Sequence, residues 1–201
     1  FINSNTYLGQ AFRFETSSTL DVYYKSRDYR HALNFIKKIE PQFIGSKPVI
    51  DSKQLVMTYF DAALVYFFTG DFKRSLLWLN HLLNNDLKEV FNQEYSFAKI
   101  LNLMIHFELG NEELMESAAR SAYSFLIKKN ILYKFERSIL DFIRKSFRFN
   151  SQKEMREELK KLHMNLLKLL KDPAEKRVVE LFQIDTWLGN KIESMKTIQR
   201  K

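Results

Sequence analysis

The side chains that most often carry out chemistry are scattered along this sequence. Its four histidines lie far apart, and none belongs to the H-E-x-x-H pattern of zinc enzymes: they are His31, His81, His106 and His163. The sequence contains no cysteine, so it offers neither a thiolate nucleophile nor a cysteine metal site. It also lacks glycine-rich phosphate-binding loops and the G-x-S-x-G nucleophile elbow. We therefore expect no enzyme activity, no bound metal and no cofactor.

Paired carboxylates are a further catalytic pattern, and the sequence has two adjacent pairs. They are Glu112-Glu113 and Glu157-Glu158. Neighbouring residues of a helix point about 100° apart, so the two acids of a pair do not face each other. We interpret both pairs as solvated helix caps and helix faces.

Charge is distributed unevenly along the chain, whose formal net charge is +8. Residues 1–119 carry 12 Lys and Arg against 14 Asp and Glu, whereas residues 120–201 carry 20 against 10. Such a basic segment can mark an acidic protein partner or nucleic acid, and it can equally be an exposed, solvated surface. Nucleic-acid binding has no support beyond charge, because the sequence contains no zinc knuckle, RRM-like aromatic motif or identifiable recognition helix.

The elements that would position any site are helices. The 201 residues include only 5 Gly and 3 Pro, and the stretches between them are rich in Leu, Lys, Glu, Ala, Met and Phe. No segment alternates polar and apolar residues between turn dipeptides, so no β-hairpin is predicted. The sequence therefore predicts an all-α fold, with helices near residues 12–25, 29–40, 52–69, 72–84, 90–109, 112–129, 132–148, 151–171 and 173–188.

Five polar residues stand where helix starts are expected. They are Asp51, Asp71, Asn111, Ser151 and Asp172. Glu or Gln follows Asp51 and Ser151 three residues later, which is the spacing of a capping box. A proline follows Asp172 at the first helical position, where its missing N–H costs nothing. We expect all five residues to cap helices.

Short turns between helices recur at a regular interval. They are expected at residues 26–28, 69–71, 110–112 and 149–151. If Arg27, Gly70, Gly110 and Asn150 are equivalent, the steps between them are 43, 40 and 40 residues. A helix pair that repeats at such a period is typical of an α-solenoid, in which each unit buries its apolar face against its neighbours.

A shared pattern of residues surrounds the first two turns. The second unit has Tyr59, Ala62, Ala63 and Tyr66 before Gly70-Asp71-Phe72, and Ser75 and Leu79 after it. The first unit repeats part of this pattern with Leu20, Tyr23, Arg27-Asp28-Tyr29, Ala32 and Ile36. Tyr23 to Ala32 and Tyr66 to Ser75 are both nine residues apart. The pattern resembles the tetratricopeptide repeat, with an extended period.

The third and fourth units depart from that pattern. His106 stands where the tyrosine is expected, Met115 where a small residue is expected, and Ser146 again replaces the tyrosine. HEAT-like or other helical pairs remain possible beyond residue 82. The resemblance implies one right-handed superhelix of antiparallel helix pairs, which we expect to span residues 1–201 as a single domain.

The segment 55–68 is apolar at every position except Thr58 and Asp61. A helix that is apolar nearly all the way round is buried on both sides. A membrane span needs about 20 apolar residues, and this run carries an aspartate, so we predict no transmembrane segment. Ala63 is expected to face Ser75 where the two helices of the second unit approach closely.

An apolar seam runs along the predicted helix 151–171. It consists of Met155, Leu159, Leu162, Leu166 and Leu169. We predict that this seam packs against the preceding unit; a dimer seam and a membrane-surface helix are the alternatives. The final helix, 173–188, is expected to cover the exposed end of the array.

The resemblance implies a concave groove lined by the first helix of each unit. Counting from the aligned turns, the partner-binding positions are Phe60, Leu64 and Phe67, then Ile100, Met104 and Phe107, then Arg137, Arg144 and Arg148. Such a groove would suit a protein or peptide segment with an apolar anchor and an acidic end. The final helices could instead fill the groove themselves.

The resemblance and the absence of catalytic motifs together predict a protein- or peptide-binding scaffold. One alternative is a regulatory or nucleic-acid-associated module that uses the basic segment, and another is a purely structural part of a larger protein. Because the sequence begins with Phe1 rather than Met, we expect it to be a piece of a larger protein. A cytoplasmic location is our expectation.

Overall fold

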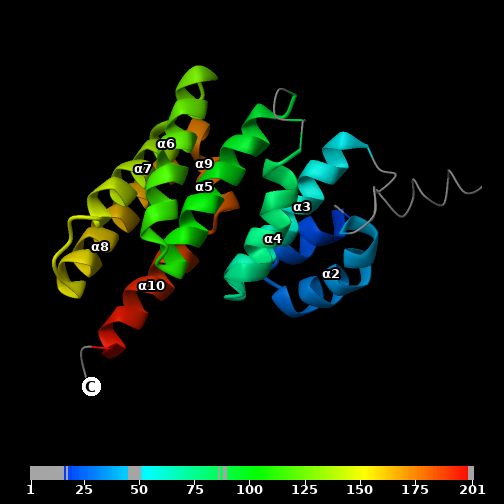
Figure 1. Ribbon diagram of the computed structural model, residues 1–201. Coiled ribbons are helices and arrows are strands. Elements are labelled where there is room, and N and C mark those ends of the chain that lie inside the picture. Colours follow the sequence, from blue (N-terminus) through cyan, green and yellow to red (C-terminus); the bar gives the residue numbers. More distant parts are fainter. Residues whose placement is uncertain (1–15, 17, 45–50, 86, 88–89, 199–201) are drawn as a thin grey trace, which may run out of the picture. The chain divides into compact units, whose positions relative to one another are not determined.

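A computed structural model describes residues 16, 18–44, 51–85, 87 and 90–198, and most of these residues are helical (Figure 1). These residues include no β-strand, so the predicted all-α class is confirmed. The chain divides into two compact units, residues 1–105 and residues 106–201.

The first unit consists of successive helices that pack as neighbours. Residues 18–25 are helical, and they are followed by α2 (Tyr29–Phe43), α3 (Ser52–Phe68), α4 (Phe72–Leu83) and most of α5 (Asn92–Leu109). Helix α3 packs against both α2 and α4. The sequence placed α2, α3, α4 and α5 correctly to within a few residues, and the start of the predicted helix 12–25 lies outside the described residues.

The second unit begins in the last turn of α5. It contains α6 (Glu112–Lys128), α7 (Lys134–Ser146), α8 (Gln152–Lys168), the short 3₁₀ helix η2 (Leu169–Lys171), α9 (Pro173–Leu181) and α10 (Ile184–Ile198). Helix α7 packs against α6, α8 and α9, and α10 packs against α8. The prediction of one final helix over 173–188 is wrong, because the chain breaks at Gln183, whose φ is +40°.

The first three predicted turns share one backbone conformation. One or two residues after each helix the backbone has a positive φ: +59° at Arg27, +79° at Gly70 and +67° at Gly110. The next N–H then donates to the carbonyl five residues earlier, which is the Schellman arrangement. These bonds run from Asp28 to Tyr23, from Asp71 to Tyr66 and from Asn111 to His106, at 2.9, 3.0 and 3.1 Å.

The fourth turn is built differently. Helix α7 ends at Ser146 and α8 begins at Gln152, so the connection is longer than at the first three turns. No residue from 147 to 151 has a positive φ. The helix break near residue 150 is confirmed, but it does not share the backbone geometry of the other three turns.

Four of the five predicted caps form. Asp51, Asp71 and Asp172 each accept at least one backbone N–H in the first turn of their helix. Ser151 Oγ accepts from the Glu154 N–H at 3.1 Å, and the Glu154 carboxylate accepts from the Asn150 N–H at 3.0 Å. Asn111 is the exception: its side chain makes no capping bond.

Helix α3 is the centre of the first unit. Its residues 58–67 are all buried, including the polar Thr58 and Asp61, as the nearly continuous apolar run predicts. The predicted close approach of α3 and α4 is also confirmed. Ser75 Oγ donates to the Ala63 carbonyl oxygen at 2.7 Å, and both residues are fully buried.

Helix α8 buries the middle of its apolar seam within the second unit. Leu159, Leu162 and Leu166 are buried, and the helix packs against α7 and α10. The seam is therefore an intramolecular contact, as predicted, and α10 supplies part of it.

Helix α9 is joined to the start of α7 by a buried carboxylate. Glu175 accepts from the backbone N–H groups of Lys134 and Phe135, at 2.8 and 3.0 Å. The rings of Phe135 and Phe182 stack beside it, 5.2 Å apart. One acidic side chain thus satisfies two N–H groups that the first turn of α7 leaves unpaired.

Candidate partner-binding groove

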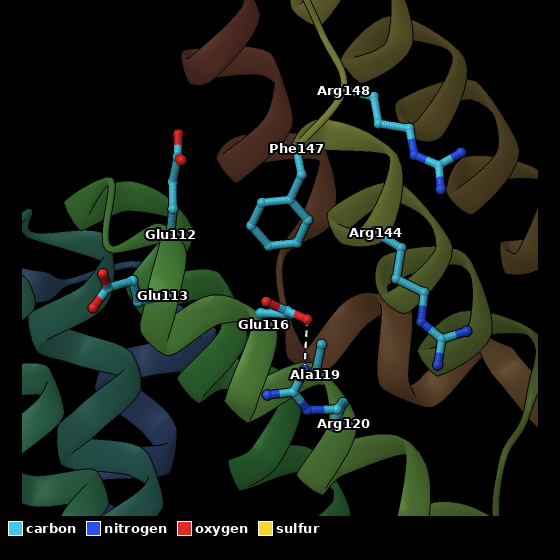
Figure 2. A pocket seen from close by; sticks show the side chains of 8 residues that line it. All are labelled: Glu112, Glu113, Glu116, Ala119, Arg120, Arg144, Phe147 and Arg148. Carbon is cyan, nitrogen blue, oxygen red and sulfur yellow. Dashed lines mark hydrogen bonds and ion pairs between the residues drawn. The ribbon is translucent and has the colours of Figure 1, made fainter.

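An open groove of about 570 Å³ lies in the second unit, where α6 and α7 pack together (Figure 2). The first half of α6 forms one wall, and the last turn of α7 with the residues after it forms the other. The lining residues are Glu112, Glu113, Glu116, Ala119, Arg120, Arg144, Phe147 and Arg148.

An exposed aromatic ring lies between the two walls. Phe147 directly follows the last residue of α7, and 39% of its surface is exposed. Figure 2 shows its ring directed into the space between α6 and α7, while the buried Ala119 lies on the α6 side. An apolar side chain of another molecule could bury itself against this ring.

The α7 wall is basic, and its charges are not neutralised by the protein. Arg144 and Arg148 are exposed, and neither side chain makes an ion pair or hydrogen bond with any residue that the structure describes. The Arg144 guanidinium lies 4.6 Å from the centre of the Tyr123 ring. This cation–π contact restrains the guanidinium while leaving its N–H donors available.

The α6 wall is predominantly acidic. Glu116 pairs with Arg120 one turn later, at 2.5 Å. Glu112 and Glu113 are exposed in the first turn of α6, and within the described part of the chain their carboxylates have no ion-pair partner. The groove therefore has unpaired acids on one wall and unpaired arginines on the other.

The structure brings together two of the three predicted arginines. Arg144 and Arg148 both line the groove. Arg137 is exposed on α7, but it is two turns away from Arg144 and is not a lining residue. Arg137 therefore presents a guanidinium group outside the groove.

The apolar part of the predicted site is in the core. The six positions Phe60, Leu64, Phe67, Ile100, Met104 and Phe107 are all buried. Phe60 packs against Phe97, and Phe67 packs against Phe68 and Phe72. None of these side chains presents an accessible surface to a partner.

Helix α10 covers the last of those positions. The Trp187 ring lies edge-on to Phe107, and Lys191 Nζ is 5.1 Å from the centre of the same ring. Glu108 accepts from Trp187 Nε1 at 2.7 Å and from Lys191 Nζ at 2.6 Å. At Phe107 the structure therefore agrees with the alternative that a final helix covers the expected partner-binding surface.

Three of the groove's features were not predicted. Phe147 lies inside the helix 132–148 that the sequence predicts, and nothing in the sequence pattern singled it out. The carboxylates of Glu112 and Glu113 were interpreted as solvated caps, and Tyr123 was not considered. Sequence spacing cannot show that α7 ends one residue before Phe147, and this early end directs the ring into the groove.

Groups with shifted pKa values lie outside this groove. Burial raises the pKa of Asp61 to about 8; nearby Asp21 adds to this increase and Lys25 opposes it. Burial lowers the pKa of His106, whose ring lies 3.4 Å from the Asn111 amide. Among the described residues, no three His, Asp or Glu side chains are close enough together to hold a metal ion. In the same residues, no helix combines the length and apolarity needed to cross a membrane.

Comparison with known proteins found no matching family model, no similar curated protein and no similar solved structure. The helical pairs and the three identical turns are compatible with a helical repeat.

Proposed function

We propose that this chain is a protein- or peptide-binding module and that the α6–α7 groove holds a segment of its partner. The observation that carries the proposal is the pair of exposed, unpaired arginines beside an exposed phenylalanine, in a groove large enough for several side chains. An apolar side chain of the partner packs on Phe147. Carboxylates of the partner segment bind Arg144 and Arg148, because guanidinium groups form strong, directional hydrogen bonds with carboxylates.

The helix pairs, which are compatible with a helical repeat, support this function. Repeats of helix pairs expose extended surfaces and bind partners through side chains on consecutive helices. We propose that the repeats are tetratricopeptide-like, on the basis of the shared turn geometry at Arg27, Gly70 and Gly110. The site that we propose lies between α6 and α7, because the six apolar positions expected from the resemblance are buried and two of the three expected arginines line this groove.

Nucleic-acid binding is the second candidate, and the basic segment 120–201 is the observation in its favour. Several of these cations already have partners, including Arg120 with Glu116, Lys134 with Asp172, and Lys161 with Glu158. The groove also contains three glutamates, which repel a phosphate backbone. A protein segment fits this charge distribution better than a polyanion does.

The test begins with selection of peptides from a displayed random library on the whole chain. Affinities of the selected peptides are then measured for the parent and for Arg144→Glu, Arg148→Glu and Arg137→Glu. The three variants make the same change of charge on α7 or just after it, but only the first two change the groove. Circular dichroism checks that each variant is folded.

We expect Arg144→Glu and Arg148→Glu each to weaken binding by about tenfold or more, because each removes a charge-assisted hydrogen bond and adds a repulsive charge. Arg137→Glu should leave the affinity within about twofold of the parent, because an exposed charge outside the site contributes little. Equal effects of all three variants would contradict the proposal. Groove-dependent binding of a single-stranded oligonucleotide, without groove-dependent peptides, would favour the second candidate.

A further inference from the structure

Opposite charges line the two walls of the groove without pairing across it. The α7 wall presents Arg144 and Arg148, and the α6 wall presents Glu112 and Glu113. No ion pair among the described residues joins one wall to the other, although Glu116 and Arg120 pair within α6. In Figure 2 the carboxylates of Glu112 and Glu113 and the guanidiniums of Arg144 and Arg148 lie on opposite sides of Phe147.

We infer that the bound segment is bipolar: a basic residue of the segment faces Glu112 and Glu113, an acidic residue faces Arg144 and Arg148, and an apolar residue between them packs on Phe147. This inference rests on the proposed function and adds the chemistry of the partner and the direction in which it lies. Each wall selects one sign of charge, so reversing the segment would place like charges together at both walls.

A segment with only acidic residues fits less well. It would satisfy the arginines, but it would also bring carboxylates near Glu112 and Glu113. Exposed charges interact over about 8 Å at physiological ionic strength, so this repulsion would be felt within a groove of this size. A segment with only basic residues meets the same difficulty at the α7 wall. Only a segment with both signs is attracted by both walls.

The helix ends explain part of this arrangement, but not all of it. Acids favour the first turn of a helix and bases favour the last turn, so each wall carries the sign that suits its own helix. Helix-end stabilisation requires neither the exposed ring of Phe147 nor the restraint of Arg144 by Tyr123. These two features are what a binding site for another molecule requires.

Removing the charges of Glu112 and Glu113 distinguishes a bipolar segment from a purely acidic one, because the affinity for a bipolar segment should fall and the affinity for an acidic segment should rise. The probes are the library peptides whose binding depends on Arg144 and Arg148. Their affinities are measured for the parent, for the double variant Glu112→Gln with Glu113→Gln, and for Glu157→Gln, which changes an exposed carboxylate of α8. All of these substitutions keep the shape of the side chain and remove its charge.

We expect the double variant to bind these peptides about three- to tenfold more weakly, because the attraction to their basic residue is lost. Glu157→Gln should have no effect. If the double variant binds more tightly or equally well, the segment is not bipolar, while the proposed function remains. If no selected peptide depends on Arg144 and Arg148, the proposed function and this inference both fail.

A variant in which the charges of the two groove walls are exchanged provides a second test. Glu112→Arg, Glu113→Arg, Arg144→Glu and Arg148→Glu together leave the net charge of the chain unchanged. Each selected peptide (the first peptide) is compared with a second peptide of the same sequence in which the acidic and basic residues are interchanged. We expect the parent to prefer the first peptide and the exchanged variant to prefer the second. The same preference in both proteins would overturn the inference.

Discussion

At the scale of single residues, Asp61 is the clearest departure from ordinary solvation. It is buried on α3, and its Oδ2 atom has no hydrogen-bond partner in the described structure. Burial disfavours the charged form, which is why its pKa lies near 8 rather than 3.8. The sequence placed Asp61 on a buried helix, but the pattern alone does not show how fully the carboxyl is removed from water.

The raised pKa of Asp61 makes stability depend on pH. Between pH 3.8 and about 8 the unfolded chain loses this proton while the folded chain keeps it. The free energy of unfolding therefore falls as pH rises through this range and changes little outside it. We expect Asp61→Asn to be more stable than the parent at pH 7, by a few kcal/mol, and nearly equal to it at pH 4. Urea unfolding at both pH values measures this, and a stability difference that does not change with pH would contradict it.

Ala63 sets how closely α3 and α4 approach. The Ser75 hydroxyl bonds to its carbonyl oxygen, and the site has no exposed surface. We predict that Ala63→Leu overpacks this contact and lowers the free energy of unfolding by about 1–3 kcal/mol. Thermal or denaturant unfolding measures the change. An unchanged melting temperature would mean that the helices are not in close contact here.

At the scale of elements, the sequence predicted what local chemistry determines. Glycines and capping residues located the turns at Gly70 and Gly110 and the starts of α3, α4 and α8. The break between α9 and α10 was missed, because Gln183 adopts a positive φ without being glycine. The burial of Phe107 could not be predicted either, since it depends on Trp187, which is far away in sequence. Periodicity shows that a face is apolar without showing which element covers it.

Two glycines should respond in opposite ways to the same substitution. Gly70 has a φ of +79° in its turn, whereas Gly189 lies within α10, and neither has an atom within 4 Å of an added Cβ. We expect Gly70→Ala to destabilise the protein by about 1 kcal/mol, because alanine is strained at positive φ. Gly189→Ala should stabilise it by about 0.5–1 kcal/mol, because alanine favours the helix. The same sign for both changes would contradict the assigned backbone conformations.

Glu175 tests the contact between α9 and α7. We predict that Glu175→Ala costs about 1–3 kcal/mol, because the N–H groups of Lys134 and Phe135 lose their acceptor. Glu180→Ala provides the matched control on the same helix, where the carboxylate is exposed. Equal effects in denaturant unfolding would show that Glu175 is not a helix cap.

At the scale of the whole molecule, the sequence predicted an all-α chain and a concentration of positive charge after residue 119. It also identified Arg144 and Arg148, by counting from the aligned turns of the resembled repeat, although α7 ends before Arg148. It did not locate the groove, which depends on where α7 ends and on how α6 lies beside it. The proposal that this chain binds a protein segment therefore depends on the geometry around Phe147.

Site-specific photo-crosslinking tests this conclusion most directly. Phe147 is replaced by a photoreactive phenylalanine analogue, and in a second protein the analogue replaces Met164, which is 57% exposed on α8. Both proteins are irradiated with a peptide selected on the parent chain. We predict that the peptide crosslinks at position 147 and not at position 164, and that unlabelled peptide competes for the crosslink. Equal crosslinking at both positions, or crosslinking at position 164 alone, would contradict a partner-binding groove between α6 and α7.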